Sequence, residues 1–226
     1  MNFDTVIFHS ASAETIIPDK KEVLRYMGQR GEADENVHSL ADSVLPLVME
    51  NLSPKGCFVL KNLVFKDEQI FVGNMKISSR SLKKNLAGCQ SAVVFALTVG
   101  IGADRLIASY SSTKPSFALV ASAGATAAVE AYADLFCGEL KSWFGQKNQY
   151  LRPRFSPGYG DFSPDFQRDF VEMTEASKHL GIYLTKAMMM TPTKSVTGII
   201  GVSECNSECP VGGCELCNNK DCIYRR

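Results

Sequence analysis

The residues best suited to bind a small molecule lie in the segment RPRFSPGYGDFSPDFQRDF, residues 152–170. Its prolines restrict φ and disfavour helix in the residues before them, so the segment is expected to be extended and stiff. Its backbone donors and acceptors would then be free for a ligand, and Gly158 would let a ligand approach closely. The prolines are Pro153, Pro157 and Pro164.

Two side chains of this segment add binding chemistry. Arg154 offers a planar fork that suits bidentate binding of a carboxylate. Tyr159 offers an aromatic face with a polar tip. Together they predict a slot for a small molecule that carries a carboxylate and a flat ring. An ordinary connecting loop is the alternative on these residues alone.

A pair of acids lies upstream in the stretch AAVEAYAD. Glu130 and Asp134 are four residues apart, so in a helix they share one face. One interpretation is the solvated side of that helix. The other is a carboxylate that faces a cationic ligand, because the neighbours of Glu130 are small and leave room beside the backbone.

Five of the eight cysteines fall within residues 205–222, in the pattern C-x3-C-x4-C-x2-C-x4-C. A C-x2-C pair lets two thiolates reach one metal from a tight turn, and two further cysteines would complete a four-thiolate shell. The spacing predicts a zinc site or an iron–sulfur cluster and does not separate the two. Free thiols are the alternative. The candidates are Cys209, Cys214, Cys217 and Cys222, with Cys205 as the spare.

Other motifs indicate structure rather than chemistry. Gly100 and Gly102 lie between a strand and a helix, where phosphate-binding loops occur, but a third glycine is missing and Asp104 would repel a phosphate. A tight structural turn is the preferred interpretation. The histidines have no spacing typical of metal ligands or of a catalytic triad; they are His9, His38 and His179.

Composition narrows the class of protein. Lysine plus arginine equals aspartate plus glutamate, so the net charge is zero, which argues against non-specific binding of nucleic acid. No uninterrupted apolar run approaches the roughly 20 residues that span a bilayer, so no membrane partner is expected. The first residues lack the pattern of a signal peptide, and clustered cysteines do not resemble a secreted disulfide framework. The chain is expected to be cytoplasmic.

Strands and helices without regular βαβ alternation predict an α+β fold, a single compact domain with a mixed or antiparallel sheet packed with helices. We expect this domain at residues 1–203 and a Cys-rich tail at residues 204–226. The first 18 residues show no period, and Pro46 suggests a kink or an early end in its helix. Helices are predicted at 19–28, 33–52, 78–88, from 103 or 104, at 116–144 and at 163–179, and strands at 56–65, 69–73, 91–100, 186–190 and 195–202.

The set of motifs resembles a known family, the activation domain of cobalamin-dependent methionine synthase. RFSPGYG resembles the R-P-A-P-G-Y-P loop of that domain, and AAVEAYAD resembles its A-E-A-F-A-E segment, in the same order. The stretch from ASKHLGIYLTKAMMM to SVTGIIG is similar to its downstream helix and strands. The likeness covers residues 90–203 well, and the Cys-rich end is closer to the free-standing bacterial version of the domain.

The resemblance implies a reactivation module that binds S-adenosylmethionine and presents its methyl group to a cobalamin carried by a separate corrinoid protein or methionine synthase. An electron, from a donor of the flavodoxin or ferredoxin type, and this methyl group would together restore methylcobalamin. Arg154 would bind the ligand's carboxylate and Glu130 its ammonium or sulfonium. The backbone of Phe155, Ser156, Pro157 and Gly158 would follow the adenosine, with Tyr159 where ligand and corrin meet.

Three features depart from the family pattern. The fused synthase domain has no Cys cluster, so the chemistry of residues 205–222 is not implied by the resemblance. Gly160 stands where that domain has proline, and an acidic partner in the N-terminal third is not assigned, although Asp34 and Glu35 are candidates. The function from another class is a metal-binding electron-transfer or interaction protein that keeps the fold without S-adenosylmethionine chemistry.

Overall fold

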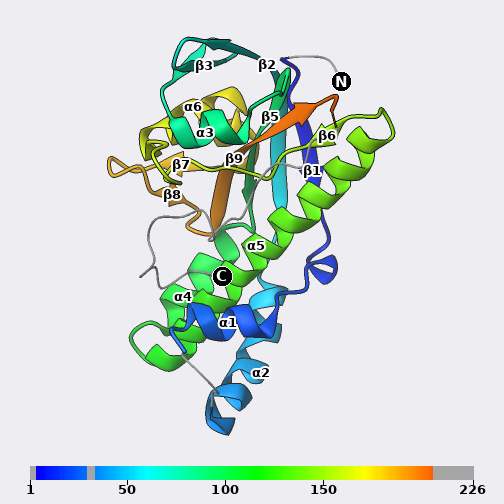
Figure 1. Cartoon of the computed structure of the whole chain (residues 1–226). Coiled ribbons are helices and arrows are strands. Elements are labelled where there is room, and N and C mark those ends of the chain that lie inside the picture. Colours follow the sequence, from blue (N-terminus) through cyan, green and yellow to red (C-terminus); the bar gives the residue numbers. More distant parts are fainter. Residues whose placement is uncertain (1–3, 30–33, 206–226) are drawn as a thin grey trace.

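The computed structural model describes residues 4–29 and 34–205, and in them an antiparallel sheet of seven strands forms the centre of the molecule (Figure 1). The order is β4-β3-β2-β5-β9-β6, with β1 paired to the first part of β2. The sheet and its covering helices confirm the predicted α+β class. The strands are β1 (Ile7–Ser10), β2 (Lys55–Lys66), β3 (Gln69–Val72), β4 (Met75–Ile77), β5 (Ser91–Thr98), β6 (Tyr150–Leu151) and β9 (Ser195–Ser203).

The central strands are buried because helices cover both faces of the sheet. All eight residues of β5 are buried, as its nearly unbroken apolar run predicts. Successive side chains of a strand point to opposite faces. Val93, Phe95 and Leu97 therefore pack in one core, whereas Val94 packs in another.

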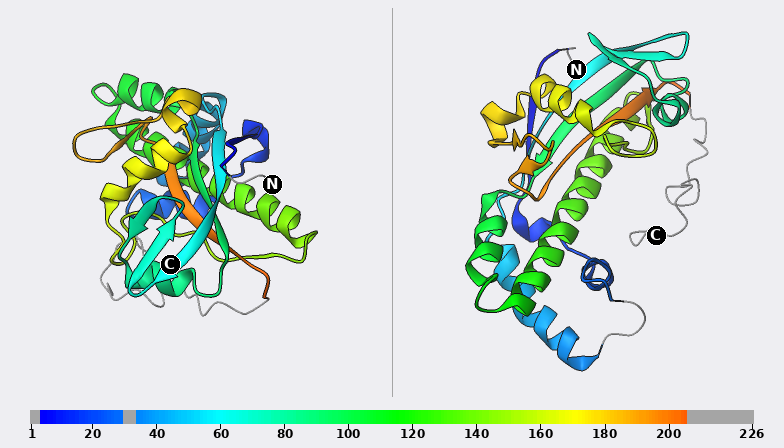
Figure 2. Two further views of the ribbon diagram at one scale, coloured as in Figure 1. Left: turned by 90° about the horizontal axis from the view of Figure 1, so that it is seen from above. Right: turned by 90° about the vertical axis from the view of Figure 1, so that its left-hand side faces the viewer.

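One long helix, α5 (Pro115–Gly145), covers the face on which Phe95 lies. Around its N-terminal half pack α1 (Lys20–Tyr26), α2 (Glu35–Glu50) and α4 (Ile101–Tyr110) (Figure 1). The other face is covered by α3 (Arg80–Asn85), α6 (Gln167–Met173) and α7 (Ala176–Leu180). Figure 2 shows α6 and α7 in yellow on the side of the strands away from α5.

The apolar composition of α5 follows from its packing on several sides. Gly124 lets α2 come close, since a Cβ there would lie 2.6 Å from Cδ2 of Leu45. Among the described residues, α5 is the one helix long and apolar enough to cross a membrane, but 61% of its most apolar window is buried inside the fold. Its composition is therefore accounted for as that of a core helix.

The single helix predicted over residues 163–179 is wrong, because the chain breaks at Glu175. A 3-10 turn (η2, Pro164–Phe166) leads into α6, and α7 starts after Glu175, whose φ of 51° is left-handed. The hydroxyl of Thr174 donates to the carbonyl oxygen of Phe170 at 2.7 Å, a local bond that competes with helix continuation. The break lets α7 turn and bury Ala176 against the sheet.

The strand predicted at residues 186–190 is also wrong. Of those residues only Met190 lies in a strand; residues 185–189 form the loop of a hairpin between β7 (Tyr183–Leu184) and β8 (Met190–Thr191). Met188 has a φ of 59°, and Met189 is 61% exposed. Three methionines in a row indicate apolar character but not burial, which here depends on where the hairpin projects.

The N-terminal half holds several smaller departures from prediction. β1 and β4 were not expected, because strands of three or four residues are too short to show a clear alternation. A 3-10 turn (η1, Ala13–Thr15) follows β1. Pro46 lies inside α2 without ending it, and α4 starts at Ile101, two residues before the earliest predicted start.

Candidate functional site

A short extended segment places Arg154 at the edge of the sheet beside α5. After β6, the amide of Arg152 donates to the carbonyl oxygen of Gly201 at 2.8 Å. Phe155 then pairs with Ile199 of β9 through both backbone groups, at 2.9 and 2.8 Å. Pro153 fits between these bonds because an edge strand leaves some amides without a ladder partner.

The prediction that this backbone is free for a ligand is wrong at several positions. Both backbone groups of Phe155 bond to β9, the amide of Gly158 donates to the carbonyl oxygen of Phe162 at 2.7 Å, and that of Tyr159 donates to Ser156 at 3.0 Å. Backbone groups that leave water need partners, and here β9 and the loop itself supply them. Recognition of a ligand therefore falls mainly to side chains.

Arg154 lies between two carboxylates of α5, those of Glu130 and Asp134, and the three side chains form the arginine cluster. Its Nη2 donates to Oε2 of Glu130 at 2.7 Å, and its Nη1 is 2.8 Å from Oδ1 of Asp134. The acids are one helical turn apart on the same face, so one guanidinium reaches both. The side chains of Arg154 and Glu130 are 18% and 27% exposed, whereas that of Asp134 is 66% exposed.

The two contacts differ in quality. Nη1 of Arg154 is buried, and the structure gives it no partner in hydrogen-bond geometry among the described residues. The contact with Asp134 is therefore an ion pair by distance only. A buried donor without a well-formed hydrogen bond carries a desolvation cost, so this nitrogen is the part of the cluster best able to accept a new carboxylate partner.

The ionisation of the cluster follows from its surroundings. Burial lowers the pKa of Arg154, but the charges of Glu130 and Asp134 outweigh that effect, so the pKa is raised and the guanidinium stays charged. Cys137 lies on α5, close to Arg154. Burial raises the pKa of the Cys137 thiol, although the charge of Arg154 acts to lower it. Cys137 is accordingly a neutral thiol at neutral pH.

The loop after Arg154 is anchored to α3 by Asp161. Its carboxylate accepts the hydroxyl of Ser79 at 2.6 Å and the amides of Arg80 and Ser81 at 2.8 and 3.0 Å. Burial acts to raise the pKa of Asp161, but these hydrogen bonds outweigh it and hold the pKa well below its usual range. Gly160 has a φ of 56°, and a Cβ there would lie 2.7 Å from Oγ of Ser81, so glycine permits this close approach.

The aromatic residues of the loop divide between core and surface. Phe155 packs with the buried Phe162, whereas Tyr159 is 50% exposed and meets Phe155 edge-on at a centroid distance of 5.7 Å. Tyr159 also contributes electrostatically to the raised pKa of Arg154. The structure thus places Tyr159 at the surface near the arginine, with Ser156 and Pro157 buried behind it and Gly158 exposed.

A second cation on the same helix face was not expected. Nζ of Lys194 donates to Oγ of Ser122 at 3.0 Å and to Oγ1 of Thr126 at 2.9 Å. Burial lowers the pKa of Lys194, and the charge of Asp104 acts against that shift. The signal that could have revealed this stripe is a polar residue at every fourth position of an otherwise apolar helix: Ser122, Thr126, Glu130 and Asp134.

The predicted metal ligands lie almost wholly beyond the part of the chain that the structure describes. Cys209, Cys214, Cys217 and Cys222 are outside the described residues. Cys205, the predicted spare, is exposed just after β9. The metal site therefore stays a prediction.

Two other candidates have structural roles. The carboxylate of Asp34 accepts the amides of Asn36 and Val37 and caps α2, and Glu35 is an exposed residue of the first turn. At the Gly100–Gly102 turn, Gly100 has a φ of 88°, and a Cβ on Gly102 would collide with the carbonyl oxygen of Asn51. These glycines fit the tight structural turn that the sequence favoured.

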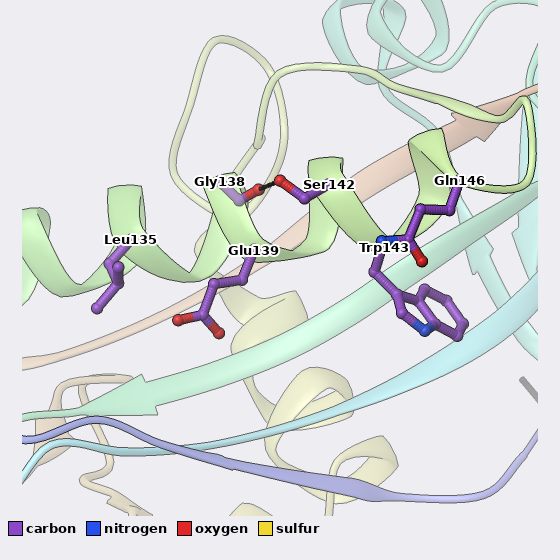
Figure 3. A pocket seen from close by; sticks show the side chains of 6 residues that line it. All are labelled: Leu135, Gly138, Glu139, Ser142, Trp143 and Gln146. Atoms are coloured by element: carbon purple, nitrogen blue, oxygen red, sulfur yellow. Dashed lines mark hydrogen bonds between the residues drawn. The ribbon is translucent and has the colours of Figure 1, made fainter.

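A surface depression lies on another side of α5. Figure 3 shows its lining residues: Leu135, Gly138, Glu139, Ser142, Trp143 and Gln146. At 100° per residue, Leu135, Glu139 and Trp143 are turned away from Glu130 and Asp134, whereas Gly138 lies at the border between the two faces. Glu139 there accepts a hydrogen bond from Nε2 of His9 at 2.7 Å, which ties β1 to α5. The depression is separate from the arginine cluster.

Comparison with known proteins relates the chain to one family and to solved structures of the same fold. A family model described as "Vitamin B12 dependent methionine synthase, activation domain" matches residues 82–225. A solved structure titled "Crystal Structure of the MetH Reactivation Domain bound to AdoHcy" has a TM-score of 0.68 and 18% sequence identity, and the match covers 90% of this chain and 80% of that one. At that identity the structural likeness concerns the fold. No curated protein sequence matches the chain.

Proposed function

The chain belongs to the family of vitamin B12 dependent methionine synthase activation domains, and we propose that it binds S-adenosylmethionine and supports reactivation of a corrinoid carried by another protein. The observation that carries the proposal is the contact of Arg154 with Glu130, which puts a cation and an anion side by side at the sheet edge. The solved relative's title names S-adenosylhomocysteine, the demethylated form of this ligand, which supports the same choice.

The ligand's charges complement this cluster. S-adenosylmethionine carries one carboxylate, one ammonium and one sulfonium. Arg154 binds the carboxylate, and its buried Nη1 gains the well-formed hydrogen bond that it lacks in this structure. Glu130 faces the ammonium or the sulfonium. The adenosine lies against the loop Phe155–Gly158, where the buried Ser156 and Pro157 form a stiff wall.

The chain's contribution is binding and orientation. Cobalamin on a partner supplies the cobalt that accepts the methyl group, together with an electron from a donor of the flavodoxin or ferredoxin type. Tyr159 is exposed beside the site, so it is placed to meet the partner's corrin. Because cofactors carry the chemistry in such systems, the site needs no acid–base pair of its own.

Titration calorimetry tests the proposal. S-adenosylmethionine binds the wild type, and Arg154→Ala weakens binding at least about tenfold, the effect of losing charge-assisted hydrogen bonds. Arg152→Ala is the matched control, since it removes the same charge from the same segment. The side chain of Arg152 bonds to the carbonyl oxygen of Ala87, near α3. It should leave affinity within about twofold.

Absence of binding by the intact, folded wild type would refute the proposal. It would favour the other class of function, a metal-binding electron-transfer or interaction protein that keeps this fold. Equal losses in the two arginine variants would instead mean that Arg154 is not the ligand's carboxylate partner.

A further inference from the structure

The cluster at the sheet edge holds more negative than positive charge. Arg154 contributes one positive charge, and Glu130 and Asp134 each contribute one negative charge, so the three groups in contact have a net charge of −1. One acid would have sufficed to neutralise the guanidinium. The second acid therefore requires an explanation in terms of what binds.

Among the described residues, the nearby ionisable groups Cys137 and Lys194 leave this balance unchanged. Cys137 is a neutral thiol because burial raises its pKa. Nζ of Lys194 donates to Thr126, one helical turn from Glu130. The charge of Asp104 acts on Lys194, and the charges of Lys194 and Asp104 sum to zero. The local excess is thus one negative charge.

The two acids are held differently. Glu130 is largely buried and makes a hydrogen bond of good geometry to Nη2. Asp134 is 66% exposed and meets Nη1 without hydrogen-bond geometry. A ligand carboxylate that took Nη1 would displace the exposed Asp134 and leave its carboxylate one helical turn from Glu130, free to face a cationic group of the ligand.

We propose that Asp134 is a specificity-determining residue that makes the site select a sulfonium ligand over the corresponding thioether. This inference rests on the proposed function. With one carboxylate, one ammonium and one sulfonium, the methyl donor has a net charge of +1, which matches the −1 of the cluster. The thioether product is a zwitterion with no net charge and leaves one acid uncompensated.

This selection would favour exchange of the thioether product for a new sulfonium donor after each methyl transfer. When the S–CH3 bond breaks, sulfur keeps the bonding electron pair, and the acceptor on the partner supplies the pair of the new bond to the methyl group. The ligand's sulfur thereby changes from positive to neutral while it is still bound. Asp134 then loses its counter-charge, which favours release of the product and entry of the next donor molecule.

The test compares three ligands on the full-length wild type and on Asp134→Asn by calorimetry. The ligands are S-adenosylmethionine, S-adenosylhomocysteine and sinefungin, an analogue with a protonated amine on carbon in place of the sulfonium. We expect Asp134→Asn to lower the preference for the sulfonium over the thioether by about tenfold, the effect of a unit charge roughly 6 Å away in a medium between protein and water. Asp134→Asn should weaken the binding of sinefungin as much as that of S-adenosylmethionine, because both ligands carry a positive charge at this position.

Glu172→Gln is the charge-matched control. Glu172 is an exposed acid on α6, on the opposite face of the sheet, and its loss should leave all three affinities unchanged. If the wild type binds the ligands but Asp134→Asn keeps the same ratio, the inference about Asp134 is wrong and the proposed function stands. If the folded wild type binds none of them, the proposed function itself fails.

Discussion

At the scale of single residues, the neighbours of a side chain decide whether it is structural or available to a ligand. Arg154 and His9 each bridge two groups of α5. Every ring nitrogen of His9 has a partner of good geometry, whereas Nη1 of Arg154 does not. The histidine therefore holds the fold together, and the arginine is the candidate for binding.

The His9 contact gives a stability prediction. Tyr132 is fully buried, and burial raises the pKa of its hydroxyl, so it stays protonated and donates to Nδ1 of His9 at 2.8 Å. Tyr132→Phe removes that donor and leaves His9 short of a partner, so the free energy of unfolding should fall by about 1 kcal/mol. Urea denaturation measures it, with Tyr183→Phe, at a 62% exposed site, as the neutral control.

At the scale of elements, the anchoring of the loop by Asp161 gives a pH prediction. The folded pKa of Asp161 is depressed, so its stabilising contribution is present above the unfolded pKa of about 4 and is lost as the pH falls below that value. Asp161→Asn should destabilise the protein at pH 7, and the difference from wild type should shrink as the pH drops from 4 towards 2. Thermal melts across that range measure it; a constant difference would contradict the assignment.

Gly102 and Gly138 both lie in helices, but only Gly102 is required by packing against a neighbouring segment. A Cβ on Gly102 of α4 would collide with the backbone of Asn51, whereas a Cβ on Gly138 of α5 would meet nothing within 4 Å. Gly102→Ala should therefore destabilise by about 1–3 kcal/mol, and Gly138→Ala should stabilise by about 0.5–1 kcal/mol. Denaturant titration of both variants checks the signs, and a stabilising effect of Gly102→Ala would rule out the packing account of Gly102.

At the scale of the whole molecule, we expect the fold not to need the residues after Cys205, because the described residues by themselves form the sheet and the helical layers on both of its faces. β9 ends at Ser203, and the hydroxyl of Ser203 donates to the carbonyl oxygen of Gly88 at 3.2 Å. A variant that ends at Cys205 should keep the wild-type melting temperature within a few degrees and keep its affinity for S-adenosylmethionine. Loss of the fold on truncation would contradict the proposed division into residues 1–203 and 204–226.

The metal prediction is tested on the same pair of proteins. If the Cys-rich tail binds metal, full-length protein purified without oxygen contains stoichiometric zinc or iron, and the variant that ends at Cys205 contains none. A brown sample with visible absorbance indicates an iron–sulfur cluster, and a colourless one with zinc indicates a tetrahedral thiolate site. Equal metal content in both proteins would refute the assignment to the tail.

The sequence by itself determined the α+β class, the buried strand β5, the long apolar helix α5 and the glycine turn before α4. Each depends on local pattern: an unbroken apolar run, small residues all round a helix, or a backbone conformation that favours glycine. The sequence also singled out Arg154 and Glu130 as candidates, from residue type and a family resemblance.

Only the tertiary structure decided what those residues touch. The contact of Arg154 with Asp134, the approach of Lys194 to α5 and the bonding of the loop to α3 all join segments far apart in the chain. The exposed methionine hairpin and the break at Glu175 were likewise missed. The physical reason is that burial and pairing depend on which elements meet, and a periodicity reports only which face of an element is apolar.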